Sequence, residues 1–338
     1  MINDKLIICY EDRNKFIGKM REKYGEKIAQ SWSRFLISED SIEQITKYLT
    51  SKGINVKKIE LNDIKAFKDI IKDDNKYLMW NISDGCDIYK GSYVPSLAKL
   101  LGFEFYGSET YAQYIAQDKF KFISICNKLN IPTPFSILYF HSTEEYLPYS
   151  PYLVFNEKDF LFVKPNIFDN NIGILCGAKT DLKNLKCIVE KIVKELKDNA
   201  LIQEYIEGFD LRVCYIGTTK KIDIDKIGIL KVEKSYKNKQ IDFINEFIAD
   251  DVEYVIEKFT NNELIRKIKN DVVKISNFLN LKDYFAFDIR VNKDKYYFLE
   301  LNTAPFIFNE SMEFYAKEYH NKDVEEVFYE SIIKYFSG

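Results

Sequence analysis

The sequence is poor in the residues that build metal centres and disulfide frameworks. It has two histidines, His141 and His320, which are too few for a multi-histidine metal site. Its six cysteines contain no Cys-x-x-Cys pair, so we expect reduced, buried thiols instead of a zinc site or a set of disulfides. It also lacks repeats and Pro/Gly/Ser-rich linkers, so domain boundaries must be read from the alternation of strand and helix patterns.

Long apolar runs and charge of one sign are absent as well. No stretch approaches the ~20 apolar residues that span a bilayer, and the apolar run near the N-terminus is too short for a signal peptide. The 49 basic and 52 acidic side chains give a net charge of −3, which marks neither a nucleic-acid nor a membrane partner. With 46% hydrophobic residues in 338, we expect a cytoplasmic globular protein of two or three domains.

The first part of the chain alternates between strand and helix patterns. Residues 5–10 read as a strand, 41–52 as an amphipathic helix and 54–61 as a second strand, which together form a β-α-β unit. A strand over 77–82 and a helix over 93–101 extend this pattern. We therefore predict an α/β N-terminal domain with a parallel sheet over residues 1–110.

The rest of the chain groups its strands into runs. A helix over 110–130 precedes strand patterns at 135–140, 152–155 and 160–165 and a helix over 181–197, which predicts a second domain over 111–200. Three strands, a helix and a hairpin follow, at 201–205, 211–217, 226–231, 262–279 and 284–302. We predict an α+β domain for 201–338.

The final hairpin carries opposed carboxylates. Period-2 alternation places two sets of residues on one face each: Tyr284, Ala286, Asp288 and Arg290 on the first strand, and Tyr296, Phe298, Glu300 and Asn302 on the second. Asp288 and Glu300 then lie nearly opposite, where like charges repel. Either a hard cation such as Mg²⁺ is held by Asp288, Glu300 and Asn302, or Arg290 or a lysine neutralises the pair.

Two further segments carry polar residues beside strands. Lys164 ends an apolar strand before a polar loop, where an ammonium can meet phosphate oxygens or simply face solvent. The turn Glu207-Gly208 precedes a strand that begins with Asp210 and Arg212, which is either a plain hairpin or part of a ligand site.

The order of these segments resembles the ATP-grasp superfamily, in its D-alanine–D-alanine ligase-like branch. The resemblance rests on four motifs: a Val-Lys-Pro strand before a loop, a Gln-Glu-Tyr-Ile-x-Gly-x-Asp linker, a Phe-Asp-x-Arg strand and a Leu-Glu-x-Asn-Thr-x-Pro strand. Upstream matches lie at 80–85, 101–109, 117–122 and 130–135. The resemblance implies an α/β pre-ATP-grasp domain (1–110) followed by a two-part α+β ATP-grasp fold. Its central subdomain (111–200) would hold a mobile loop, and its C-terminal subdomain (201–338) the metal and substrate site.

The resemblance also implies roles for individual residues. Lys119 and Lys164 would contact ATP phosphates, Gln203 and the backbone of Glu204, Tyr205 and Ile206 the adenine, and Asp210 the ribose. Asp288, Glu300 and Asn302 would hold Mg²⁺, with Mn²⁺ as an alternative, and Lys231 would add a phosphate contact. Such enzymes form an amide or peptide bond between a small carboxylate and an amine through an acyl phosphate, often as homodimers. An ATP-grasp phosphotransferase and a non-catalytic nucleotide-binding relative are the alternatives.

Three departures from the ligase pattern affect the expected product. Asp169–Gly173 stands where the ligases have a Gly-Ser-Ser-x-Gly loop, and Ala286 stands where they have an arginine that steadies the oxyanion. We take Arg290 as the catalytic substitute, with Arg212 as a second choice. The N-terminal Gly-Gly-x-Ser-x-Glu element is absent, so we expect a product other than D-alanyl-D-alanine.

Overall fold

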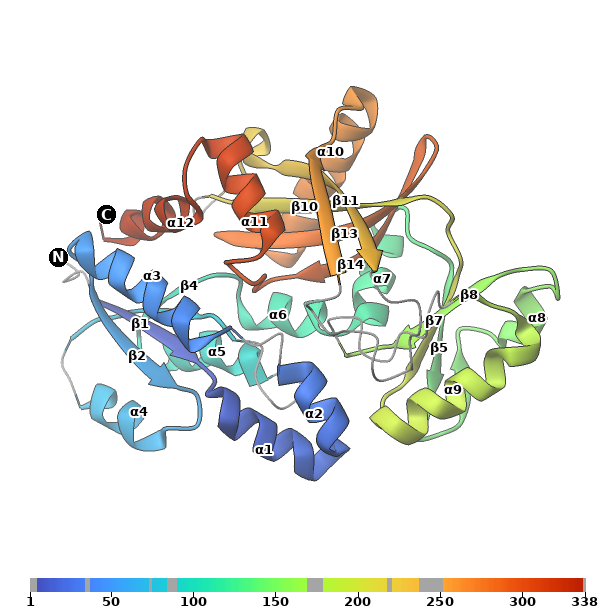
Figure 1. Cartoon of the computed structure of the whole chain (residues 1–338), viewed down its shortest axis with the longest axis horizontal. Coiled ribbons are helices and arrows are strands. Elements are labelled where there is room, and N and C mark those ends of the chain that lie inside the picture. The colour runs from blue at the N-terminus through green and yellow to red at the C-terminus, as the bar shows by residue number, and fades with distance from the viewer. Residues whose placement is uncertain are drawn as a thin grey trace.

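Three β-sheets organise the molecule, one of them parallel and two antiparallel (Figure 1). The computed structural model describes residues 5–33, 37–72, 75–83, 90–168, 179–217, 221–236 and 252–336. The predicted fold class, an α/β unit followed by a two-part α+β arrangement, is confirmed. The boundaries drawn at 110 and 200 remain a prediction.

The N-terminal sheet is parallel and has the order β2-β1-β3-β4. Its strands are β1 (Lys5–Tyr10), β2 (Asn55–Glu60), β3 (Leu78–Asn81) and β4 (Glu104–Tyr106). Its helices are α1 (Arg13–Tyr24), α2 (Glu26–Ser33), α3 (Glu39–Ser51), α4 (Ile64–Ile71) and α5 (Tyr93–Leu100). The α1–α2 pair went unpredicted, because only Phe16 and Met20 of α1 are buried and so few apolar positions leave little periodicity.

The predicted helix over 110–130 is two helices, α6 (Thr110–Ala116) and α7 (Lys119–Lys128). Asp118 caps the second one, since its carboxylate accepts a hydrogen bond from the Lys121 amide at 3.0 Å. The break matters for the site because it makes Lys119 the first residue of α7 and buries its side chain.

The central sheet is antiparallel, with the order β6-β5-β9-β7-β8, and α9 (Leu182–Leu196) packs on it (Figure 1). Its strands are β5 (Ser136–Phe140), β6 (Glu145–Leu147), β7 (Leu161–Pro165), β8 (Lys179–Thr180) and β9 (Ala200–Glu204). The strand predicted at 152–155 is wrong: this segment forms the short helix α8 (Pro151–Val154). Proline at the first helical position favours a helix start.

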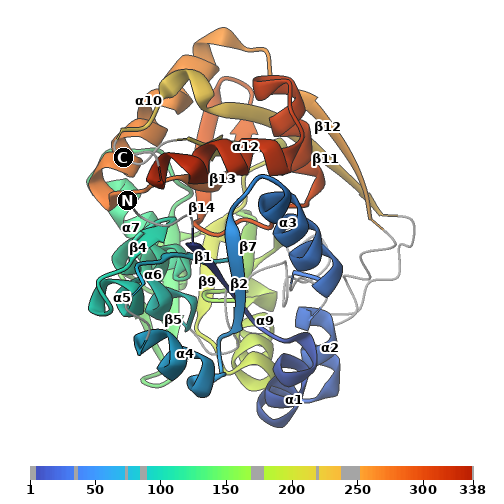
Figure 2. The same ribbon diagram turned by 90° about the vertical axis from the view of Figure 1, so that its left-hand side faces the viewer.

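The C-terminal sheet has the order β12-β11-β10-β13-β14 and is covered by α10 (Asn262–Leu279) (Figure 2). Its strands are β10 (Phe209–Ile216), β11 (Gly228–Tyr236), β12 (Val252–Lys258), β13 (Tyr284–Asn292) and β14 (Lys295–Asn302). The chain ends with α11 (Glu310–Tyr315), a π-helical turn (Ala316–His320) and α12 (Val324–Ile332). Apolar residues on one face of the sheet pack against α10. The opposite face packs in part against α11, α12 and the N-terminal sheet, and its remaining part carries polar side chains of β10, β13 and β14.

An aromatic seam joins the N-terminal sheet to the C-terminal one. We use this name for Trp80, Tyr106, Tyr284 and Phe328, whose rings stack or meet edge-on at centroid distances of 5.3–6.4 Å. The Trp80 indole donates to the Tyr284 hydroxyl at 2.9 Å. In the described part of the chain, no helix has both the length and the apolar character to cross a bilayer.

Candidate active site

Four charged side chains form a row across the C-terminal sheet and α7. Asp288 on β13 lies directly opposite Glu300 on β14, as the sequence predicted, and directly opposite Arg212 on β10. Arg212 Nη1 lies 2.6 Å from Asp288 Oδ1, and Lys119 Nζ lies 3.8 Å from Glu300 Oε2. We call Arg212, Asp288, Glu300 and Lys119 the charge row. Cations therefore flank the carboxylate pair at both ends.

A β-bulge aligns the two carboxylates. The β13–β14 register runs from Asp288 opposite Glu300 to Ile289 opposite Phe298, so Leu299 is an extra residue. The prediction that Tyr296 and Phe298 share a face with Glu300 is therefore wrong. The bulge reverses the alternation, so the two aromatic rings enter the core while Glu300 stays on the polar face.

The two carboxylates differ in how firmly they hold a proton. Burial raises the pKa of Asp288, Arg212 lowers it in part, and the negative charge of Glu300 raises it further. Burial also acts to raise the pKa of Glu300, but Lys119 and Lys164 outweigh this and lower it. The side chains of Asp288 and Glu300 are each 31% exposed, so the charge row opens to solvent. Of the two carboxylates, Asp288 is therefore the one that protonates first as the pH falls.

The two predicted phosphate lysines both lie near Glu300. Lys119 and Lys164 are buried, with 3% and 5% of their surfaces exposed, and both act electrostatically on Glu300. Lys119 Nζ also donates to the Phe168 carbonyl at 2.8 Å. Two buried lysines beside two carboxylates and Arg212 give this spot a net positive charge. A polyphosphate chain suits such a charge balance.

Arg290 does not join the charge row. Its Nη1 donates to Asp210 at 2.8 Å and its Nε donates to the Ile206 carbonyl at 3.1 Å. The guanidinium beside Asp288 is that of Arg212, so we prefer Arg212 to Arg290 as the candidate catalytic arginine. Strand register explains the difference, because Arg290 lies directly opposite Asp210, two register positions along from the pair of Arg212 and Asp288.

Lys231 is not brought to this face of the sheet. It lies opposite Leu211, whose side chain is in the core under α10, whereas Asp210 and Arg212 alternate to the other face. Lys231 Nζ pairs with Glu257 at 2.9 Å and with Glu233 at 2.6 Å. Lys231 therefore points away from the face that carries Arg212 and Asp288, and its ammonium is paired with two surface carboxylates.

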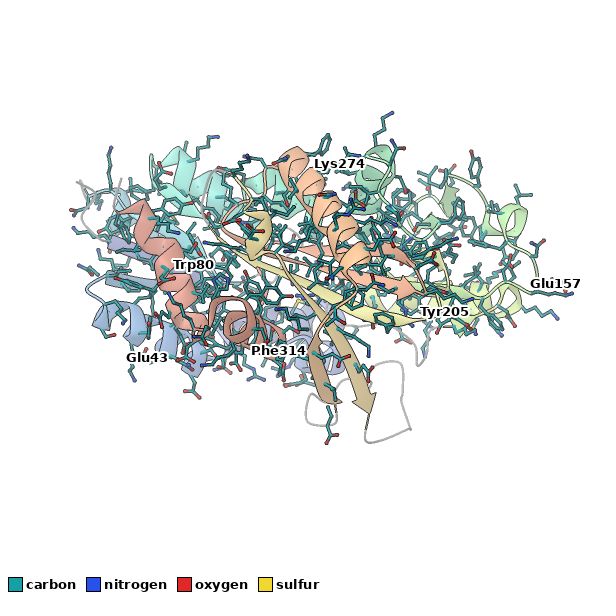
Figure 3. All side chains as sticks on the ribbon, turned by 90° about the horizontal axis from the view of Figure 1, so that it is seen from above. Glu43, Trp80, Glu157, Tyr205, Lys274 and Phe314 are labelled. Atoms are coloured by element: carbon teal, nitrogen blue, oxygen red, sulfur yellow. The ribbon has the colours of Figure 1, made fainter. Side chains whose placement is uncertain are left out.

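The predicted adenine segment links the central and C-terminal sheets (Figure 3 labels Tyr205 there). Gln203 is buried and donates to the Ser136 hydroxyl at 2.9 Å. The backbone amides of Glu204 and Tyr205 donate to the carbonyls of Phe135 and Phe160, at 3.0 and 2.9 Å. These two amides are thus committed to the protein.

Gly208 ends this segment at a close approach to β13. Its φ is +138°, and a Cβ there would lie 1.7 Å from the Val291 carbonyl oxygen. Arg290 fixes the same segment through the Ile206 carbonyl. The segment is therefore pinned to β13 at two points, immediately before Asp210 on β10.

Two further charged residues, Lys179 and Glu11, were not singled out from the sequence. Lys179 lies over the rings of Phe160 and Tyr205, with its Nζ 4.0 and 4.9 Å from their centroids. Glu11 follows β1 directly and is 1% exposed, at the carboxyl end of the parallel sheet. A charged residue immediately after an apolar strand was the signal available for Glu11. The Asp169–Gly173 loop lies outside the described residues.

The two carboxylates of the charge row, together with Asn302, offer oxygen ligands that fit a hard divalent cation. Asp288 and Glu300 supply carboxylate oxygens, and Asn302 Oδ1 is fixed by the Ala304 amide at 3.1 Å. No group of three His, Cys, Asp or Glu residues able to hold a metal occurs among the described residues. Two carboxylates and an amide match the sparse protein ligation of Mg²⁺, which also takes substrate phosphates.

Comparison with known proteins gives one consistent group. The family model described as "D-ala D-ala ligase C-terminus" matches residues 154–334. A D-alanine–D-alanine ligase of Fervidobacterium nodosum is 28% identical over 292 residues, covering 80% of this chain and 84% of the relative.

Solved structures show the same fold. A Bacillus anthracis D-alanine–D-alanine ligase complexed with ATP has a TM-score of 0.64 at 16% identity, with 98% of both chains covered. The VanG D-Ala:D-Ser ligase of Enterococcus faecalis has a TM-score of 0.67 at 15% identity, covering 98% of this chain and 99% of that one.

Proposed function

Since this chain belongs to the D-alanine–D-alanine ligase family of ATP-dependent ligases, we propose that it joins one small amino acid to another through an acyl phosphate. A substrate carboxylate oxygen bonds to the γ-phosphorus of ATP as the bond from that phosphorus to the β–γ bridging oxygen breaks, which releases ADP. The amine nitrogen of the second substrate then bonds to the acyl carbon, phosphate leaves, and the nitrogen loses a proton.

The charge row is the observation that carries this proposal. An anionic carboxylate must approach an anionic phosphate, and this approach needs fixed positive charge around the reacting atoms. Lys119, Lys164 and Arg212 supply it from α7, β7 and β10. Because burial keeps water from screening these cations, each acts more strongly than it would on the surface.

In this proposal Asp288, Glu300 and Asn302 hold Mg²⁺, with Mn²⁺ as an alternative. When bound, the ion neutralises phosphate charge and orients the phosphate chain. The direct opposition of Asp288 and Glu300 supports the assignment, because a divalent cation relieves the repulsion between two adjacent carboxylates.

Asp210 and the segment Gln203–Ile206 would bind the nucleoside. Asp210 is 42% exposed at its side chain, and Arg290 holds it in place, so its remaining carboxylate oxygen can accept from a ribose hydroxyl. Arg212 would steady the developing oxyanion, the role that we first assigned to Arg290 as the substitute for the arginine missing at Ala286. A planar guanidinium suits that contact.

The product is the finer part of the proposal. Our expectation of a product other than D-alanyl-D-alanine is not supported by the Fervidobacterium nodosum relative, a D-alanine–D-alanine ligase, so D-alanine is the first substrate to test. Glu11 adds a reason, since a buried carboxylate at the carboxyl edge of a parallel sheet is suited to a substrate ammonium. D-Alanine with D-serine is the second pair to test.

One experiment tests the reaction type and the substrates together. ADP release is measured with D-alanine alone and with D-serine added, and hydroxylamine is included to trap an acyl phosphate as a hydroxamate. We expect amine-dependent ADP release and a hydroxamate from the first substrate. A phosphorylated alcohol or amine, with no hydroxamate from any carboxylate, would instead identify a phosphotransferase.

A further inference from the structure

A three-residue turn connects the end of β7, in the central sheet, with the start of α7, where Lys119 lies. Residues Asn166, Ile167 and Phe168 follow β7, and we call them the lysine turn. The Asn166 side chain accepts from the Phe120 amide at 2.9 Å and donates to Asp118 Oδ1 at 2.9 Å. Its carbonyl accepts from the Lys119 amide at 3.2 Å. The turn is thus bonded to the first residues of α7.

A buried carboxylate holds the other side of the lysine turn. Asp198, 2% exposed, follows α9 and accepts from the Ile167 amide at 2.8 Å and from the Asn199 amide at 2.7 Å. The Phe168 amide also hydrogen bonds to it. Phe168 therefore has its N–H toward Asp198 and its carbonyl toward the Lys119 ammonium.

The Phe168 ring is fixed by a different part of the chain. It meets Tyr24 of α1 edge-on, with centroids 5.4 Å apart, and packs with Ile28 of α2 and Leu196 of α9. The ring is 4% exposed. The N-terminal helices thus restrict where the Phe168 carbonyl can lie.

We propose that Asp198 is a positioning residue, which sets the lysine turn so that the Phe168 carbonyl aims Lys119 at the nucleotide phosphates. This inference rests on the proposed function for the role of Lys119. Asp198 itself does not touch the substrate. It acts through the Phe168 peptide group, which its negative charge polarises toward the ammonium, and it also attracts the Lys119 ammonium directly.

The test compares Asp198→Asn with Asp181→Asn. Asparagine at 198 would set an amide donor against a backbone N–H, so the turn would lose an acceptor. Asp181 is the matched control because its carboxylate caps α9 in the same lobe, accepting from the Asn184 amide at 3.0 Å, and does not contact the lysine turn. Assays at about pH 8.5 keep Asp198 ionised, since burial raises its pKa to about 7.

We expect Asp198→Asn to raise the KM for ATP roughly 10-fold, the scale of one charge-assisted contact, and to leave kcat within about threefold. Lysine acylation followed by mass spectrometry supplies a readout without turnover. Lys119 should become several-fold more reactive, while Lys164, equally buried but held in β7, should not. Asp181→Asn should change neither measurement.

Two outcomes would overturn the inference. One is an Asp198→Asn protein that matches Asp181→Asn in KM and in Lys119 labelling. The other is a protein in which Lys119 and Lys164 labelling rise together, which would indicate general loosening. If Asp198→Asn does not fold, Tyr24→Leu tests the same turn from its ring side and should raise Lys119 labelling selectively. A failure of the proposed function is distinguishable, because the wild type would then show no ATP turnover while the labelling result stands.

Discussion

Asp288 lies between the carboxylate of Glu300 and the guanidinium of Arg212, because β13 lies between β14 and β10 in the sheet. Arg212 Nη1 donates to Asp288 Oδ1 at 2.6 Å, and this contact holds the guanidinium beside the carboxylate pair. The sequence could predict the opposition of Asp288 and Glu300 from alternation alone. It could not predict which arginine lies beside them, since that depends on the register of β10, a strand more than 70 residues away in the chain.

We expect Arg212→Lys to lower kcat by roughly 10²–10³, the cost of losing one oriented oxyanion donor. ATP affinity should change by less than about threefold, because Lys119 and Lys164 still meet the phosphates. ADP release and calorimetric titration of the nucleotide measure the two effects. Equal losses in turnover and affinity would place Arg212 in nucleotide binding instead.

Arg290→Lys should give the opposite pattern. Arg290 ties Asp210 to the Ile206 carbonyl, so a lysine would release the nucleoside segment and weaken ATP by about 1–2 kcal/mol, the scale of one or two lost charge-assisted bonds. At saturating ATP, turnover should stay within about threefold of the wild type. A large loss of kcat at saturation would restore Arg290 as the catalytic arginine.

Elements with a strong local signal were predicted well. The helix over 262–279 is confirmed to the residue as α10, because an Asn261 cap precedes a continuous apolar stripe. The helix over 110–130 was predicted as one, because its apolar period runs on across Asp118, where the cap breaks it. The bulge at Leu299 leaves no local signal, since it arises from the pairing of β14 with β13.

The segment before β10 gives a prediction at the level of elements. Gly208→Ala would force a Cβ against the Val291 carbonyl, so the segment must move, and we expect the thermal midpoint and ATP affinity both to fall. Positive-φ strain of about 1–3 kcal/mol is the minimum cost. Gly53→Ala is the matched control, since Gly53 has a φ of +91° but open space around its Cβ position. Equal effects of both variants would show that strain alone matters.

At the scale of the whole molecule, one buried carboxyl lies where three distant segments meet. Asp283 precedes β13, and its Oδ2 accepts from the Gly107 amide at 2.8 Å and from the Tyr335 hydroxyl at 2.7 Å. Burial raises its pKa to about 7, although these hydrogen bonds and Lys282 act to lower it. Such a group favours the folded state most below pH 4, and this contribution is lost as pH rises toward about 7.

Asp283→Asn should remove that pH dependence. Asparagine also tolerates the φ of +57° found here. Between pH 4 and pH 8 the free energy of unfolding of the variant should gain about 2–4 kcal/mol relative to the wild type, as a shift of roughly three pKa units implies. Denaturant titrations at both pH values measure this difference. An equal change in the free energy of unfolding of the two proteins between pH 4 and pH 8 would show that Asp283 does not titrate in this range.

The homodimer stays a prediction, which sedimentation can test.

The aromatic seam gives the molecule an optical probe of its own. The sequence has two tryptophans, Trp32 and Trp80, and Trp80 is fully buried against Phe328 with its indole bonded to Tyr284. In a Trp32→Phe background, the emission of Trp80 would report directly on the junction of the N-terminal and C-terminal sheets. A shift of that emission to longer wavelength would mean that water has entered the junction. Separation of the two sheets could thus be followed in solution without any attached label.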